Sequence, residues 1–83
     1  MEKVIVEVFV PVLGRSFDMF IPLQAPMHEI LELMIKAVTE MSDGRFIPNE
    51  TTALSRREDG TIFNINLSAF ELGIRNGSRL MLI

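Results

Sequence analysis

The sequence contains no cysteine and only one histidine among its 83 residues. Without cysteine, the chain can form neither a disulfide nor a thiolate metal site. One histidine cannot build a zinc site, which needs three or four nitrogen or sulfur ligands. The folded state must therefore depend on apolar packing, for which 48% hydrophobic residues supply the material. We expect no cofactor and no metal ion.

Positive charge is also scarce in this sequence. Eight lysines and arginines against eleven acidic residues give a net charge of −3. Binding to a phosphate backbone needs lysines and arginines clustered on one face. Arg56 and Arg57 are adjacent, but Glu58 and Asp59 follow at once. A solvated turn is predicted there, and no nucleic acid is expected as a partner.

Long apolar runs are absent as well. A membrane-spanning helix needs about 20 mostly apolar residues in succession, but the most apolar stretch, residues 27–38, is interrupted by Glu29, Glu32 and Lys36. The N-terminus has no basic segment followed by a long apolar one, as a signal peptide would have. The sequence thus predicts one cytoplasmic domain over residues 1–83, with no membrane insertion.

Strands are indicated by apolar residues at every second position. Residues 3–10 (KVIVEVFV) place a valine at each even position, which is typical of a strand with one buried face. The valines are predicted to face the core. Residues 16–21 and 78–83 alternate in the same way. The apolar side chains predicted on the outward face are Ile5, Phe9, Phe20, Met81 and Ile83.

One amphipathic helix is predicted over residues 26–42. Apolar side chains recur there every three or four positions and form one broad arc, opposite an arc of charged residues. Pro26 suits the first helical position, where its missing N–H is not needed. Gly44 suits the left-handed residue that often ends a helix.

The remaining elements are predicted to be shorter. Residues 52–57 and 61–65 are predicted as strands joined by a turn, because Asp-Gly tolerates positive φ. Ser68 and Glu71 have the spacing of a capping box, which indicates a short helical turn. The order ββαββ, then this turn and a closing strand, predicts an α+β fold with one helix covering one sheet face. The predicted core comprises Val4, Val6, Phe17, Leu54, Leu67, Phe70, Leu80 and Leu82.

The last third of the chain resembles the ubiquitin superfamily. Residues 67–74 (LSAFELGI) and 76–80 (NGSRL) are similar to a stretch in which three apolar side chains plug the core before a glycine turn starts the last strand. The resemblance implies a ubiquitin-like β-grasp fold, with a mixed sheet whose last strand pairs parallel to the first. It also implies that the three plugs are Leu67, Phe70 and Ile74.

Within that superfamily, the chain is most similar to the YukD/EsaB-type proteins. The similarity lies in the length and in an ending that contains Gly73, Ile74, Gly77 and Leu80. YukD/EsaB-type proteins are small cytosolic ubiquitin-like proteins associated with type VII (ESX-like) secretion in Gram-positive bacteria. The resemblance implies an accessory or regulator of such a system, with a secretion-system component as a protein partner.

Two other functions are weighed against this one. The sequence ends at Ile83 without Gly-Gly, and conjugation or sulfur transfer needs an exposed glycine carboxylate that can enter an activating enzyme. A sulfur-carrier or modifier role is therefore disfavoured, and a non-conjugating protein is expected. A self-associating structural domain is the second alternative.

No group of residues indicates an active site. A nucleophile needs a base within hydrogen-bond reach and a group that orients the base. His28 falls on the polar arc of the predicted helix, and Glu29 and Glu32 share a solvated stripe with Lys36. The protein is not expected to be an enzyme.

The outward apolar residues of the sheet are the predicted protein-binding surface. An apolar patch rimmed by charged residues is typical of such a surface, and the rim predicted here comprises Lys3, Glu7, Asp18 and Arg79. Singly exposed apolar residues are also common on proteins without any binding role, and the same face could serve a homodimer. The predicted surface comprises Ile5, Phe9, Phe20, Met81 and Ile83.

Overall fold

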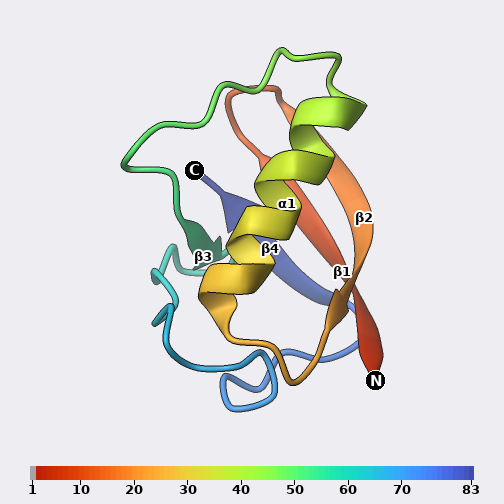
Figure 1. Cartoon of the computed structure of the whole chain (residues 1–83), viewed down its shortest axis with the longest axis vertical. Coiled ribbons are helices and arrows are strands. Elements are labelled where there is room, and N and C mark those ends of the chain that lie inside the picture. The colour runs from red at the N-terminus through yellow and green to blue at the C-terminus, as the bar shows by residue number, and fades with distance from the viewer. Residues whose placement is uncertain (1) are drawn as a thin grey trace.

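The computed structural model describes residues 2–83 of the chain. A four-stranded sheet has the order β2-β1-β4-β3, and one helix lies across it (Figure 1). The elements are β1 (Lys3–Val10), β2 (Arg15–Pro22), α1 (Met27–Met41), β3 (Leu54–Arg56) and β4 (Ser78–Leu82).

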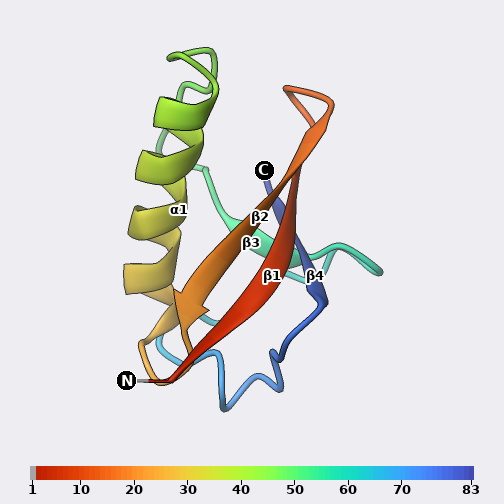
Figure 2. The same ribbon diagram turned by 90° about the vertical axis from the view of Figure 1, so that its right-hand side faces the viewer.

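The sheet is mixed, as the sequence predicts. β1 pairs antiparallel with β2 and parallel with β4, and β3 pairs antiparallel with β4. Figure 2 shows α1 on one side of the sheet, so the opposite face carries no helix from residues 2–83. The predicted α+β fold, with a single helix covering one face, is confirmed.

The core lies between α1 and the helix-facing side of the sheet. All four β1 valines are buried, with exposed fractions of at most 5%. From α1, the buried side chains are Met27, Ile30, Met34 and Val38, which follow the three- and four-residue spacing of one helix face. Six predicted core residues are buried: Val4, Val6, Phe17, Leu54, Leu80 and Leu82.

The predicted plug at Phe70 is wrong. Its side chain is 61% exposed, whereas the neighbouring Ala69 is completely buried and Leu67 is half-buried. The Phe70 N–H donates to the Leu23 carbonyl over 2.9 Å and anchors this turn against the end of β2. Successive residues of a helical turn point about 100° apart, so the anchored turn buries one neighbour and exposes the other. Ile74 is buried as predicted.

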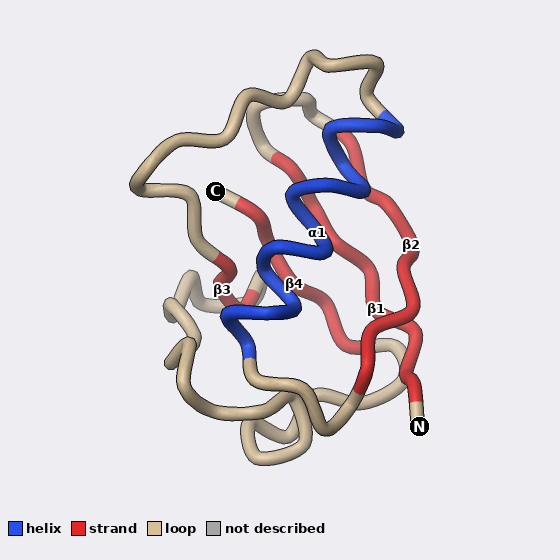
Figure 3. The backbone as a smooth tube through the Cα atoms, viewed as in Figure 1, coloured by secondary structure: helices blue, strands red, loops and turns tan. Residues whose placement is uncertain are grey.

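The strand predicted over residues 61–65 does not form. The chain does turn back after β3, with a positive φ at Gly60, but only one isolated bridge joins Ser55 to Ile62. The Asn64 side chain then accepts a hydrogen bond from the Asn66 N–H at 2.9 Å, a local turn that competes with strand pairing. Residues 57–77 therefore form loops and turns, and β3 has three residues. Figure 3 shows this long loop region between β3 and β4.

The end of α1 and the turn at Ser68 otherwise form as the sequence predicts. Gly44 has a φ of 78° after α1, as predicted for the end of the helix. The Ser68 N–H donates to the Glu71 carboxylate at 3.0 Å, and the Glu71 N–H donates to the Ser68 hydroxyl at 3.1 Å. This reciprocal pair confirms the capping box, although it starts a single turn and not a helix.

Candidate functional site

The predicted binding residues all lie on the sheet face opposite α1, here called the open face. Burying the β1 valines sends Ile5 and Phe9 to the other side of the strand, because side chains alternate between faces. Phe20, Ile83 and Ile5 are 69%, 46% and 36% exposed, while Phe9 and Met81 are half-buried. The strand parity predicted from the sequence is therefore correct.

Strand register sorts these side chains into two groups. Ile5 lies opposite Phe20 on β2, and Phe9 lies beside Met81 on β4. Ile83 follows two positions after Met81 and points to the same side. The open face thus has an Ile5–Phe20 pair near one end and the Phe9–Met81–Ile83 group near the other.

A row of charged residues crosses the open face between the two groups. Glu7 lies opposite Asp18 on β2 and beside Arg79 on β4. The sequence places these charges on the rim of one patch, whereas the register places them through its middle. A partner that covers the whole face must therefore match apolar, charged and apolar surfaces in succession.

Arg57 covers part of this face. Its Nη1 atom donates to the Glu7 carboxylate at 2.7 Å, and its guanidinium carbon lies 4.4 Å from the centre of the Phe9 ring. The two side chains of the ion pair are each 36% exposed, so solvent weakens the Coulomb attraction. Sequence reasoning assigned Arg57 to a solvated turn and missed this contact, which joins residues 50 positions apart.

The polar residues weighed as catalytic groups do not converge. His28, Glu29 and Glu32 are exposed on α1. Within residues 2–83, no three histidine, aspartate or glutamate side chains form a group that could hold a metal ion. No helix in the same part of the chain is long and apolar enough to cross a membrane.

Comparison with known proteins gives both a family and a set of similar folds. The family model described as "WXG100 protein secretion system (Wss), protein YukD" matches residues 4–82. No curated protein matches the sequence.

Among solved structures, two single domains are similar over the full length of this chain. One is the EccD5 ubiquitin-like domain from Mycobacterium xenopi, with a TM-score of 0.82, 22% identity and 94% of that domain covered. The other is the ubiquitin-like domain of the Mycobacterium tuberculosis type VII secretion system protein ECCD1, with a TM-score of 0.81, 20% identity and 99% covered.

A similar fold also occurs inside a much larger chain. One chain of the MycP5-free ESX-5 inner membrane complex matches all of this protein over 21% of its own length, with a TM-score of 0.72 and 19% identity. At these identities the likeness shows the fold alone, which is ubiquitin-like.

Proposed function

Because this chain belongs to the YukD family of the WXG100 protein secretion system, we propose that it is a non-conjugating, non-enzymatic protein-interaction module. In this proposal it acts in the cytoplasm as an accessory or regulator of a type VII (ESX-like) secretion system. Its partner is a protein component of that system, and it binds that partner through the open face.

The observation that carries the proposal is the apolar surface on the sheet face opposite α1. α1 packs against one face only, while the other face carries Phe20 at 69% exposure and Ile83 at 46%. Phenylalanine and methionine are enriched in the buried centres of interfaces. The charged row between the two apolar groups adds a means of selecting a partner, because unlike charges must meet across an interface.

The secretion role is supported by the family match and by the proteins in which similar folds occur. Ubiquitin-like domains of this shape occur in EccD-type proteins and within a chain of an ESX-5 inner membrane complex. The cytoplasmic location is supported by the resemblance to small cytosolic YukD/EsaB-type proteins. A module that binds a component of the secretion system agrees with both the secretion role and the cytoplasmic location.

The test compares variants of the open face with a matched control. Phe20→Ser and Met81→Asp alter the two apolar groups, and Val12→Ser alters an apolar residue that is 76% exposed outside the open face. Binding to purified cytoplasmic portions of the secretion-system proteins is measured by titration calorimetry. We expect Phe20→Ser and Met81→Asp to weaken binding about tenfold or more, as loss of a central contact does, and Val12→Ser to leave it unchanged.

Thermal unfolding and solution mass of each variant complete this test. Both open-face variants should keep the unfolding temperature of the wild type within a few degrees. If they fold and bind as well as the wild type, the open face is not the interface. If the wild type is a dimer that both variants dissociate, the open face serves self-association instead of a secretion component.

A further inference from the structure

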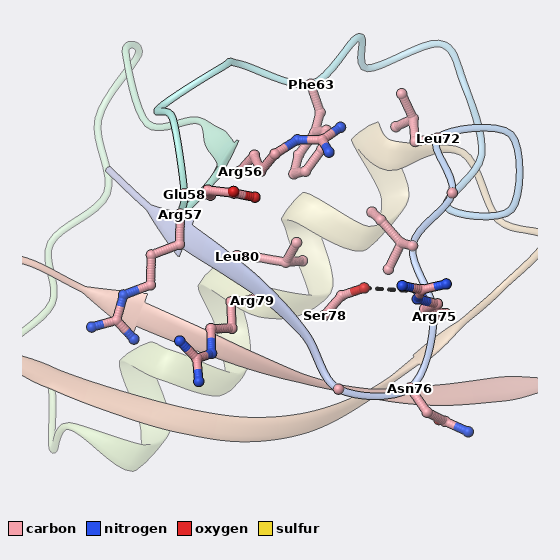
Figure 4. Close-up of a pocket in the computed structure, with 13 residues that line it drawn as sticks. Arg56, Arg57, Glu58, Phe63, Leu72, Arg75, Asn76, Ser78, Arg79 and Leu80 are labelled. Atoms are coloured by element: carbon pink, nitrogen blue, oxygen red, sulfur yellow. Dashed lines mark hydrogen bonds between the residues drawn. The ribbon is translucent and has the colours of Figure 1, made fainter.

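Half of the positive charge of the protein surrounds one concave region at the sheet edge, here called the notch. Its volume is about 780 Å³ (Figure 4). Glu58 is the one acidic residue among the lining residues that the structure describes. Four of the eight lysines and arginines of the chain line it. They are Arg56, Arg57, Arg75 and Arg79.

The notch exists because β3 leaves β4 early. The strands pair only as far as Arg56 and Leu80, and one further hydrogen bond of 3.2 Å runs from the Arg57 N–H to the Arg79 carbonyl. Beyond that point the chain turns away, so the start of β4 has no β3 residue paired beside it. The loop before β4 forms the other wall, where the Arg75 N–H donates to the Ser78 hydroxyl at 2.9 Å.

Three of the four guanidinium groups have no carboxylate partner in the part of the chain that the structure describes. Among residues 2–83, Arg57 alone of the four forms an ion pair, with Glu7. Arg56, Arg75 and Arg79 are exposed, and the Arg56 guanidinium lies 5.8 Å from the centre of the Phe63 ring. The lining carries a charge of +3, from four arginines and Glu58, so the rest of this chain carries −6 against the net −3.

The arrangement suits a chain with several charges better than a single anion. Arg57 and Arg79 lie on one side of β4, while Arg56 and Arg75 lie apart from them (Figure 4). The apolar residues that line the notch are Phe63, Leu72, Ile74 and Leu80, of which Leu72 is half-buried and the other three are buried. Cations that lie apart from one another match a ligand whose carboxylates are spaced along a chain.

We infer that the notch binds an acidic, extended polypeptide segment of a partner protein. Carboxylates of the segment pair with the guanidinium groups, which hold them in charge-assisted hydrogen bonds. The segment lies in the notch beside the start of β4, where its carboxylates can reach the guanidinium groups. This site is centred on the β3 side of the sheet, although Arg57 and Arg79 also border the open face, and it goes beyond the open-face function proposed above.

Charge complementarity favours a short acidic peptide over nucleic acid. A nucleic acid carries its charge continuously along its length, so it would extend beyond the notch onto a surface with a net charge of −6. That surface would repel it, while a short segment ends within the positive region. The same field would speed the arrival of an acidic segment and weaken at high salt.

The experiment uses a fluorescent peptide of alternating glutamate and valine as the probe. Its anisotropy is titrated with the full protein, and a peptide with glutamine in place of glutamate is the ligand control. We expect the glutamate peptide to bind and the glutamine peptide not to bind. We also expect affinity to fall at least tenfold between about 50 and 500 mM NaCl, because salt screens exposed charges.

Two double variants distinguish binding at the notch from a general effect of net charge. Arg56→Glu with Arg75→Glu reverses two notch cations, and Lys36→Glu with Arg45→Glu reverses two exposed cations elsewhere, with the same change in net charge. We expect at least a tenfold loss of peptide affinity for the first and less than about threefold for the second. Equal losses would overturn the proposal, and so would tighter binding of a single-stranded oligonucleotide than of the peptide.

Amide chemical shifts of the wild-type protein give a readout that does not depend on variant stability. The glutamate peptide should move the signals of Gly73, Gly77 and Arg79 and leave those of α1 in place. Shifts confined to other regions would contradict the notch. The Phe20→Ser variant should bind the peptide as the wild type does. Failure of peptide binding therefore leaves the open-face proposal intact, and failure of the open-face test leaves the notch proposal intact.

Discussion

Leu82 and Ile83 are neighbours in the chain, but one faces the core and the other faces away from it. Their exposed fractions are 1% and 46%. Leu82→Ala should lower the free energy of unfolding by about 2–5 kcal/mol, because it removes buried methyl groups and leaves a cavity. Ile83→Ala should lower it by less than about 1 kcal/mol.

Urea unfolding followed by far-UV circular dichroism measures both variants. The sequence has no tryptophan or tyrosine, so fluorescence is of little use. Equal losses for the two variants would mean that the strand faces are not as the structure shows them.

The Glu7–Arg57 contact is the second prediction at the residue scale. A double-mutant cycle with Glu7→Gln and Arg57→Gln should give a coupling free energy of about 0.5–1 kcal/mol, since each side chain is 36% exposed and solvent screens the pair. The coupling should shrink in high salt. The control is a second cycle that combines Glu7→Gln with Arg79→Gln, because Arg79 lies beside Glu7 in register but forms no ion pair with it. A larger coupling for Arg79 would contradict the observed pairing.

At the scale of elements, the capping box at Ser68 decides how the turn before β4 is held. Ser68→Ala removes the acceptor for the Glu71 N–H and should lower the free energy of unfolding by about 0.5–2 kcal/mol. Amide hydrogen exchange should speed up in residues 69–74. Ser16→Ala, at an exposed position of β2, should change stability by less than about 0.5 kcal/mol. Unchanged exchange around Glu71 would show that other contacts hold the turn.

The short β3 shapes both proposed surfaces. Because it pairs with β4 over only three residues, the chain that follows can carry Arg57 over the open face and leave the start of β4 exposed. The short β3 therefore allows Arg57 to cover part of the open face and also leaves the notch open. A longer β3 would close the notch.

For the whole molecule, one core joins the helix to the sheet, and the chain should unfold as one unit. The buried residues of α1, β1 and β4 belong to a single apolar cluster. Calorimetry should give an unfolding enthalpy of about 60 kcal/mol, from about 0.7 kcal/mol per residue, equal to the van't Hoff value. A helix signal that is lost at a lower temperature than the phenylalanine near-UV signal would contradict this.

The sequence by itself determined the parts of this protein that depend on neighbouring residues. Alternation of valines determined which side of β1 is buried, and the spacing of apolar residues determined α1. The spacing of Ser68 and Glu71 determined their capping box. These patterns are local, since a strand or helix imposes its period on residues that are close in the chain. The resemblance in the C-terminal third led to the family that the comparison confirms.

Only the tertiary structure decided which distant residues meet. Anchoring of the turn to Leu23 buried Ala69 in place of Phe70. Strand register placed the Asp18–Glu7–Arg79 row between two apolar groups. The early departure of β3 placed Arg56 and Arg57 around the same notch as Arg75 and Arg79. Register and crossover set these contacts between residues far apart in the chain, and no local period records them.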